Sequence, residues 1–182
     1  MRHCQIPPTF RKCVLFAIVL VAGAGVSRAE EDFLQVIVRS AHAVQIRPSL
    51  VLAVIYVESR GKPTALDFNL PHGVSVPKFP PDVEAGLKEL WAMPTNNVDI
   101  GLMQVNYKYW GNELKVSKED LLKPDVNIAA GSAILKDRIT KDGEYLGVGH
   151  YHSFTPDKAK LYANMVLKID KIIAERWPEL SR

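Results

Sequence analysis

Residues 47–61 read RPSLVLAVIYVESRG, and this stretch decides the fold. Residues 50–57 are all apolar, which is typical of an element buried on every side. The β-branched residues in this run would also suit a strand. Pro48, however, is typical of a first helical turn, and the length of 12 to 13 residues before Gly61 favours a helix. We therefore expect a buried central helix that ends in a carboxylate, Glu58.

The position of Glu58 gives it a potential acid chemistry. Its neighbours Val54, Ile55 and Val57 are apolar. Desolvation among such residues disfavours the carboxylate and raises its pKa, which makes the group a usable acid near neutral pH. A Glu at a helix end that reaches solvent is the commoner arrangement, because most charged residues are exposed. Spacing alone therefore does not identify a catalyst.

Helical patterns flank this segment on both sides. Residues 31–44 have an amphipathic pattern with acidic residues in the first turn. Ser117 starts a capping-box-like sequence for a short helix that stops before Pro124, and Asp125 is placed to cap the next helix. The last helix is expected to follow Thr155, with proline at its first position, and to run towards Trp177.

Residues 64–97 interrupt the helical pattern. Their prolines forbid long regular structure before a short helix candidate at residues 83–91, and any small β-ribbon would lie here. Strand signals elsewhere are few. The sequence thus predicts a mainly α (α+β) single domain with a small irregular or β-containing insertion lobe.

The first 29 residues have the pattern of a secretory signal peptide. Arg11-Lys12 precedes an apolar run at residues 14–26, and small residues flank Arg28 before a cleavage position at Glu30. A retained anchor is the alternative, but 13 apolar residues fall short of the roughly 20 that cross a bilayer. We therefore expect a periplasmic or secreted protein, residues 30–182, with no stable membrane span after processing.

Removal of this segment changes the charge balance. The whole chain has a formal charge of +3, but the four basic residues of positions 1–29 leave with the leader, and 19 Lys and Arg then face 20 Asp and Glu, a charge of −1. The basic pI is therefore no argument for a nucleic-acid partner. Cys4 and Cys13 also leave, so neither disulfide nor thiolate chemistry is expected in the mature protein.

Metal and cofactor sites are not predicted. His150 and His152 invite a metal interpretation, but zinc needs three or four converging ligands, and only His42 and His72 are left as distant additions. The sequence contains no Gly-rich phosphate loop. We predict that the protein works without a metal or another cofactor.

Four short motifs give the strongest functional signal. They are Glu58-Ser59, Gly101-Leu-Met-Gln104, Asn127-Ile-x-x-Gly131 and Tyr151, in this order. Each is weak alone, but together they resemble the catalytic (SLT) domain of the soluble lytic transglycosylases, which belong to the lysozyme-like superfamily. The resemblance covers residues 43–169. The forms of residues 99–106 and 151–153 look most like the small specialised transglycosylases that accompany conjugation, pilus and secretion machines.

The resemblance implies a mechanism and a set of site residues. Lytic transglycosylases cleave the β-1,4 bond between N-acetylmuramic acid (MurNAc) and N-acetylglucosamine (GlcNAc) in peptidoglycan, and leave a 1,6-anhydroMurNAc product. Glu58 would be the catalytic acid and then the base. Substrate-binding roles would fall to Gln104, Tyr151, Asn127, Ser59 and Met103.

These binding residues also have simpler interpretations. Gln104 could make an ordinary loop hydrogen bond, and Met103 suits the core or the cleft floor. Ser59 could bond only the backbone, and Asn127 could serve helix packing. The hydroxyl of Tyr151 is expected near Glu58. A further aromatic cluster, at Tyr107, Tyr109 and Trp110, could stack on sugars but is more often core.

Two other functions compete with the transglycosylase. One is a hydrolytic muramidase of the same fold. In the related goose-type lysozymes an Asp that helps to position water follows Gly-Leu-Met-Gln-Val, whereas Asn106 stands here; Asp99 and Asp67 are candidate substitutes. The other is a non-catalytic, peptidoglycan-binding assembly component. In each case the expected partners are glycan strands and components of a secretion, pilus or conjugation apparatus.

Overall fold

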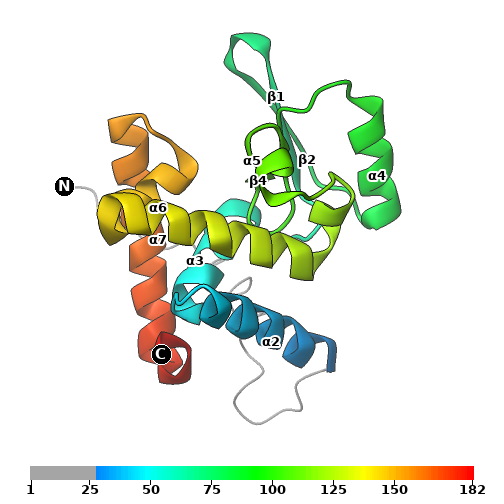
Figure 1. The fold of residues 1–182 in the computed structure, drawn as a ribbon. Helices are drawn as coiled ribbons and strands as arrows, with labels where there is room; N and C mark the ends of the chain where they lie inside the picture. Colours follow the sequence, from blue (N-terminus) through cyan, green and yellow to red (C-terminus); the bar gives the residue numbers. More distant parts are fainter. Residues whose placement is uncertain (1–27) are drawn as a thin grey trace, which may run out of the picture.

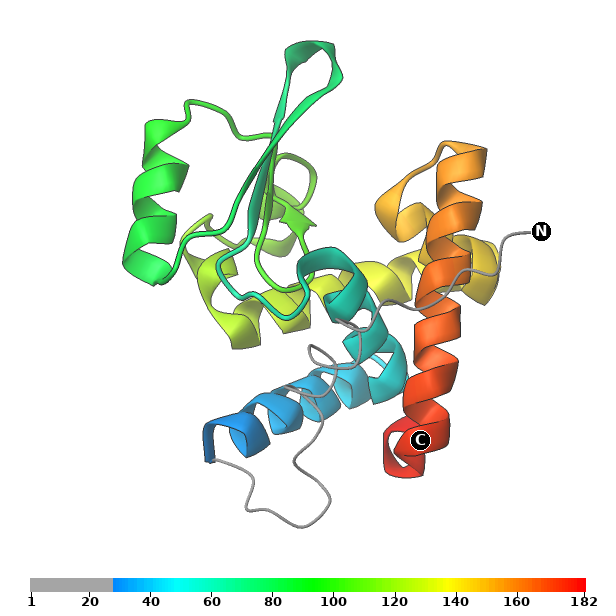
Figure 2. The ribbon, with the colours of Figure 1, turned by 180° about the vertical axis from the view of Figure 1, so that it is seen from behind.

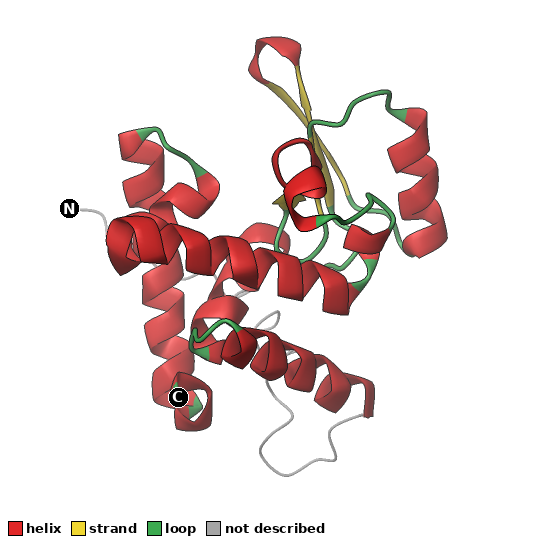
Figure 3. Ribbon diagram, viewed as in Figure 1, coloured by secondary structure: helices red, strands yellow, loops and turns green. Residues whose placement is uncertain are grey.

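The structure, a computed structural model, describes residues 28–182 (Figure 1). The predicted signal peptide, residues 1–29, lies outside the described residues except for its last two positions. Mainly helical structure with one small antiparallel sheet confirms the predicted fold class (Figure 3). The longer helices form one lobe, and the sheet forms the centre of a second, smaller lobe.

Helix α3 (Pro48–Ser59) is the centre of the helical lobe. The apolar run is a helix and not a strand, which confirms the prediction, and residues 48–55 are all buried. Helix α2 (Arg28–Ala43) and helix α7 (Pro156–Arg176) pack against it, and the short helix η4 (Pro178–Ser181) closes its lower end (Figure 2). Helix α6 (Pro124–His152) packs against α2 and α7. A helix enclosed on all sides has no use for a polar face, which explains its uniform composition.

The insertion lobe contains a four-stranded antiparallel sheet. Strands β1 (Leu66–Leu70), β2 (Val74–Lys78), β3 (Val98–Ile100) and β4 (Val105–Asn106) lie in the order β2-β1-β3-β4, and η2 (Pro71–Gly73) joins the first two. Pro77 is tolerated because β2 is an edge strand. The predicted short helix is present as α4 (Val83–Ala92), which Asp82 caps through the Ala85 amide.

Two shorter elements connect the sheet to the helical lobe. Helix α5 (Tyr107–Leu114) follows β4 directly, and Asn106 caps it. The short helix predicted after Ser117 is a single 3₁₀ turn, η3 (Asp120–Leu122), and the Ser117 hydroxyl accepts from the Asp120 amide as the capping pattern predicts. Helix α6 begins at Pro124, one residue before the expected cap.

Helix α6 is broken at Gly143, a break that the sequence did not predict. Gly143 has a φ of 77°, and this separates a first arm, residues 124–142, from a second arm, residues 144–152. The arms pack closely at Gly147, where an added Cβ would lie 2.5 Å from the Ile139 Cα. The break turns the second arm back, so that Tyr151 and His152 face the sheet-bearing lobe.

Within residues 28–182 no single helix has the length and apolar composition for a membrane span. The bent pair 32–43 and 48–59, whose axes differ by 117°, meets that criterion only when the two are counted together. Most of the second segment is buried in the core of the fold.

A partly buried group of ion pairs fixes the start of α3 against α6 and α7. Arg47 donates to Asp170 of α7 at 2.6 to 3.2 Å and to Glu144 of α6 at 2.6 and 3.1 Å. Ser49 also donates to Asp170, at 2.7 Å. The Asp170 side chain is only 7% exposed, whereas that of Glu144 is 49% exposed. Asp170 thus gathers both polar side chains at this end of α3.

Substitution of Asp170 by Ala is expected to destabilise the protein by about 3 kcal/mol, because it leaves the Arg47 guanidinium without its buried partner. Glu144→Ala removes a partner of the same arginine at the surface and should cost about 1 kcal/mol or less. Urea unfolding of both variants measures the difference. Equal losses would contradict the central role of Asp170.

Candidate active site

A cleft of about 840 Å³ lies between the two lobes. Glu58 of α3 lies on its wall, and the sheet, α5 and the second arm of α6 supply much of the remaining lining. Acidic and amide side chains gather on the sheet side, while Arg138, His150, His152 and Lys158 line the helical side. The cleft can therefore hold a polar, extended ligand between an acidic and a basic wall.

Glu58 is a protonatable group at the cleft surface. Helix α3 ends one residue later, where Arg60 takes a left-handed conformation with a φ of 56°, so the chain turns away and leaves the carboxyl group at the cleft. Its side chain is only 12% exposed. Burial raises the pKa of Glu58 from 4.5 to about 7, a hydrogen bond from Tyr162 opposes this shift, and the charge of Asp99 adds to it.

Tyr162 is the partner of Glu58 that the sequence analysis missed. Its hydroxyl donates to Glu58 Oε1 at 2.6 Å. It lies 104 residues further along the chain, on the buried face of α7 with Ala159, Ala163 and Val166. The spacing of these residues could have identified Tyr162 as buried, but not its partner.

His152 completes the surroundings of the carboxyl group. Its ring stacks on that of Tyr162, with centroids 4.7 Å apart and an interplanar angle of 5°. His152 Nδ1 lies 3.9 Å from Glu58 Oε1. Burial, and then the charge of Lys158, lower the pKa of His152, so the ring is neutral at pH 7 and leaves Glu58 without a cationic partner there.

Tyr151 lines the cleft, but its hydroxyl has a different role from the expected one. It donates to the Met103 carbonyl at 2.8 Å. The hydroxyl that holds the carboxyl group of Glu58 belongs to Tyr162. Tyr151 instead joins the second arm of α6 to the loop that precedes β4.

Gln104 lies in that loop and lines the cleft as predicted. Its Nε2 donates to the carbonyls of Ala65 and Gly101, at 3.0 and 2.9 Å. Both amide protons are therefore committed within the protein, and the group left for a ligand is the acceptor Oε1. The left-handed backbone of Gln104, with a φ of 47°, turns the side chain back over its own loop.

Asn127 holds this loop from beneath and lies outside the cleft lining. It is 1% exposed; its Oδ1 accepts from the Met103 amide, and its Nδ2 donates to the carbonyls of Ile100 and Leu121. These bonds use its donors, so the expected sugar contact does not fit this placement. Asn127 acts by fixing the loop that carries Gln104.

Ser59 and Met103 also lie outside the cleft lining, which favours their simpler interpretations over contact with substrate. The Ser59 hydroxyl donates to the Ile55 carbonyl and accepts from the Gly61 amide, so it closes the end of α3. Met103 is fully buried and packs against Gly131, where an added Cβ would lie 2.6 Å from its sulfur. The small residue in the Asn-Ile-x-x-Gly motif makes room for this side chain.

A row of polar side chains on the sheet faces Glu58. Asp67 pairs with Asp99 across β1 and β3, and Asp99 pairs with Asn106 across β3 and β4. Asp99 accepts from Asn69 at 2.6 Å and from Asn106 at 2.9 Å. Burial raises the pKa of Asp99, the two amides oppose this, and Asp67 adds to it.

Tyr109 and Trp110, left out of the predicted site, also line the cleft.

A family model described as the transglycosylase SLT domain matches residues 35–161, more than half of the chain. The chain belongs to the transglycosylase SLT domain family. No curated protein and no solved structure matches it. The family confirms the resemblance and the lysozyme-like fold, and it indicates an enzyme that acts on peptidoglycan. The specialised, apparatus-associated subtype stays a prediction.

Substitution of Asn127 by Asp should destabilise this SLT domain by about 3 kcal/mol or more at pH 7, because a carboxylate oxygen then faces two carbonyl oxygens. The loss should shrink at pH 5, since a protonated carboxyl group can donate to one of them. Urea unfolding at both pH values measures this, with the exposed Asn112→Asp as control. A loss no greater than that of the control would contradict the role of Asn127.

Tyr162→Phe should raise the pKa of Glu58 above about 7, because the change removes the hydrogen bond that favours the carboxylate and keeps the ring that stacks on His152. Carbon-13 NMR of labelled glutamate follows the titration, and Glu58→Gln assigns the signal. Tyr151→Phe, which removes a hydroxyl bonded elsewhere, is the matched control. A Glu58 pKa that is unchanged in Tyr162→Phe, or falls, would rule out this assignment.

Proposed function

We propose that this protein is an exported peptidoglycan lytic transglycosylase that cleaves the MurNAc-GlcNAc β-1,4 bond and forms 1,6-anhydroMurNAc. The observation that carries the proposal is the state of Glu58. With a pKa of about 7 and a position at the cleft, it can give up and take back a proton near neutral pH.

The reaction needs one carboxyl group used twice. Glu58 gives its proton to the glycosidic oxygen as the bond to the MurNAc anomeric carbon breaks, which releases the GlcNAc hydroxyl. The resulting carboxylate takes the proton of the MurNAc 6-hydroxyl, and that oxygen closes onto the anomeric carbon. Tyr162 holds Glu58 Oε1 through both steps. The neutral acid is restored and no water is consumed, in contrast to the two-carboxylate scheme of most glycosidases.

The hydrolytic muramidase is the second candidate, and Asp99 is the observation that favours it. Its charge contributes to the raised pKa of Glu58, so it lies within electrostatic reach. Both of its oxygens, however, accept hydrogen bonds from amides, and Asn106 stands where goose-type lysozymes have an Asp. An Asp99 held in this way is less able to orient an attacking water, which favours the transglycosylase.

The biological setting is the finer part of the proposal. We infer that the enzyme makes local openings in the wall for a conjugation, pilus or secretion apparatus, and that it is periplasmic or secreted. The forms of residues 99–106 and 151–153, together with the signal-peptide pattern, support this inference. A non-catalytic assembly component of the same apparatus is the alternative, and the buried, protonatable Glu58 argues against it.

Digestion of purified sacculi followed by mass spectrometry of the soluble muropeptides tests the activity. We expect anhydromuropeptides, one water lighter than hydrolytic products, and a loss of at least a thousandfold in Glu58→Gln, since the general acid is removed. Reducing-end products would instead indicate the muramidase. No release by the folded protein would favour the assembly component.

A folding control belongs with this experiment. The folded-state pKa of Glu58 is about 7, above its ordinary value of 4.5. The stability that the neutral carboxyl group gives is therefore lost as the pH rises from about 4.5 through about 7. Glu58→Gln should therefore unfold at a temperature equal to or above that of the wild type at pH 8. A clear decrease would assign the lost activity to misfolding.

A further inference from the structure

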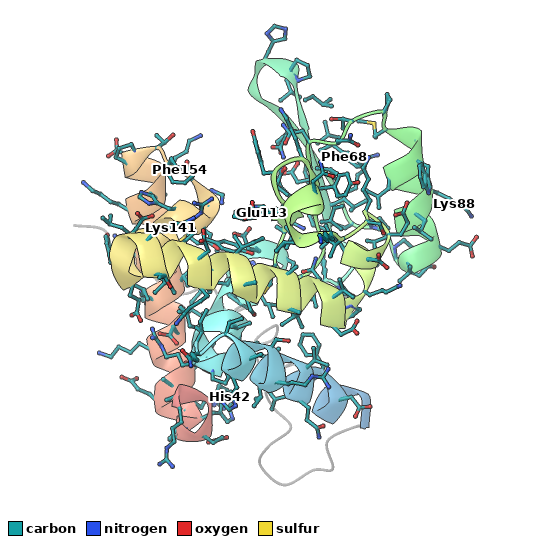
Figure 4. The ribbon with its side chains drawn as sticks, viewed as in Figure 1. His42, Phe68, Lys88, Glu113, Lys141 and Phe154 are labelled. Carbon is teal, nitrogen blue, oxygen red and sulfur yellow. The ribbon has the colours of Figure 1, made fainter. Side chains whose placement is uncertain are left out.

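Arg138 lies on the basic wall of the cleft between two aromatic rings. Its guanidinium carbon is 5.2 Å from the centroid of Trp110 on α5 and 5.0 Å from that of Phe154, which follows α6. All three residues line the cleft, and Figure 4 shows Phe154 on the helical side of the gap. Two rings at cation–π distance restrict the plane of the guanidinium, so that its N–H groups can point only along its edges.

The donors of Arg138 form no hydrogen bond within the described part of the chain, although its side chain is only 21% exposed. The nearest carboxylate in an ion pair is that of the adjacent Asp137, at 3.8 Å, and Lys141 holds this carboxylate at 2.8 Å.

Arg47 shows what such an arginine does elsewhere in the same fold. Its side chain is 27% exposed, close to the value for Arg138, and it donates to two carboxylates at distances down to 2.6 Å. A guanidinium buried to this extent usually has acceptors, because desolvated donors without partners are costly. Arg138 lacks them and borders the cleft, so its missing partner is expected to arrive with the ligand.

The charges around Arg138 define the kind of ligand. Lys158 lies on the same wall, and its charge contributes to the lowered pKa of His152. His150 also lines this wall, held by Asp142 at 2.7 Å. Glu113 of α5 lines the cleft too but forms no ion pair with Arg138 within 4.0 Å in the described part of the chain. An anion with two acceptor oxygens matches the edge of the guanidinium best.

We propose that Arg138, held between Trp110 and Phe154, binds a carboxylate of the peptidoglycan strand beside the bond that is cleaved. This inference rests on the proposed function, which supplies the substrate class. Two sources have the required chemistry: the lactyl carboxylate of MurNAc that has lost its peptide, and the carboxylates of an attached stem peptide. The site thus makes the enzyme sensitive to the state of the stem.

Binding measured by calorimetry in a Glu58→Gln background separates this site from turnover. The probes are a GlcNAc tetramer without carboxylate, a peptide-free GlcNAc-MurNAc oligomer, and the same oligomer with stem peptides. Arg138→Gln should weaken the carboxylate-bearing probes by about ten- to a hundredfold and change the GlcNAc tetramer by less than about twofold. Weakening of the peptide-free oligomer alone assigns the lactyl carboxylate, which is an amide in the peptide-bearing oligomer. Weakening of the peptide-bearing oligomer alone assigns the stem, and weakening of both shows that the site accepts either carboxylate.

Two further variants test whether the effect depends on the planar pair of N–H donors of the Arg138 guanidinium. Arg138→Lys keeps the charge without the planar pair of donors and should restore only part of the affinity. Arg176→Gln is the matched control, because Arg176 also stacks on an aromatic ring, Trp177 at 5.1 Å, but lies outside the cleft lining. It should leave binding of all three probes unchanged.

The outcomes separate the two proposals. If Arg138→Gln weakens all three probes equally, or none, the carboxylate site is overturned while the proposed function stands. If the Glu58→Gln parent binds neither MurNAc-containing probe, the proposed function fails, and this inference fails with it. A selective loss that disappears at high salt supports a charged contact, because salt screens such contacts at partly exposed sites.

Discussion

A carboxyl group that is buried and yet borders the cleft is the constraint on which the rest of this structure depends. Glu58 can be buried only because α3 runs through the middle of the helical lobe, and it can meet a ligand only because the helix ends one residue later. Burial disfavours the charged form, and the single hydroxyl of Tyr162 is too weak to offset this, so the pKa settles near 7. The apolar composition of residues 50–57 is therefore part of the chemistry as well as of the fold.

Polar side chains hold the two lobes in register around that group. Asp170 fixes one end of α3 through Arg47 and Ser49. At the other side of the cleft, Asn127 of α6 binds three backbone groups of the sheet-bearing lobe, and this sets the loop that carries Gln104. Both are buried and fully engaged, so each specifies one arrangement and would penalise others. Asn127, which the motif analysis placed on the substrate, thus acts by positioning a residue that lines the cleft.

The sequence patterns predicted those elements whose conformation depends on residues close together in the chain. The apolar run gave α3 and Glu58, and the proline at the start of α7 placed that helix correctly. What could not be predicted depends on distant contacts. Tyr162 and Glu58 are 104 residues apart, and nothing in either neighbourhood indicates the other. The break at Gly143 likewise depends on the close packing of Gly147 against Ile139, which appears only once both arms are folded. Burial, and then the charge of Glu58, raise the pKa of Tyr151, so its side chain lies near Glu58. Motif order, however, carries no direction for a hydroxyl, and that of Tyr151 donates to Met103.

The acidic row on the sheet has a use that does not require it to activate water. Asp67 and Asp99 are cross-strand neighbours, and the charge of each opposes ionisation of the next carboxyl group. The effect reaches Glu58, whose pKa Asp99 helps to raise. Asn69 and Asn106 in turn favour the charged form of Asp99 by donating to its two oxygens. An Asp in place of Asn106 would remove one of these donors and add a third charge to the row. The amide at this position therefore suits an enzyme whose sheet keeps the general acid protonated and leaves attack on the sugar to the substrate's own hydroxyl.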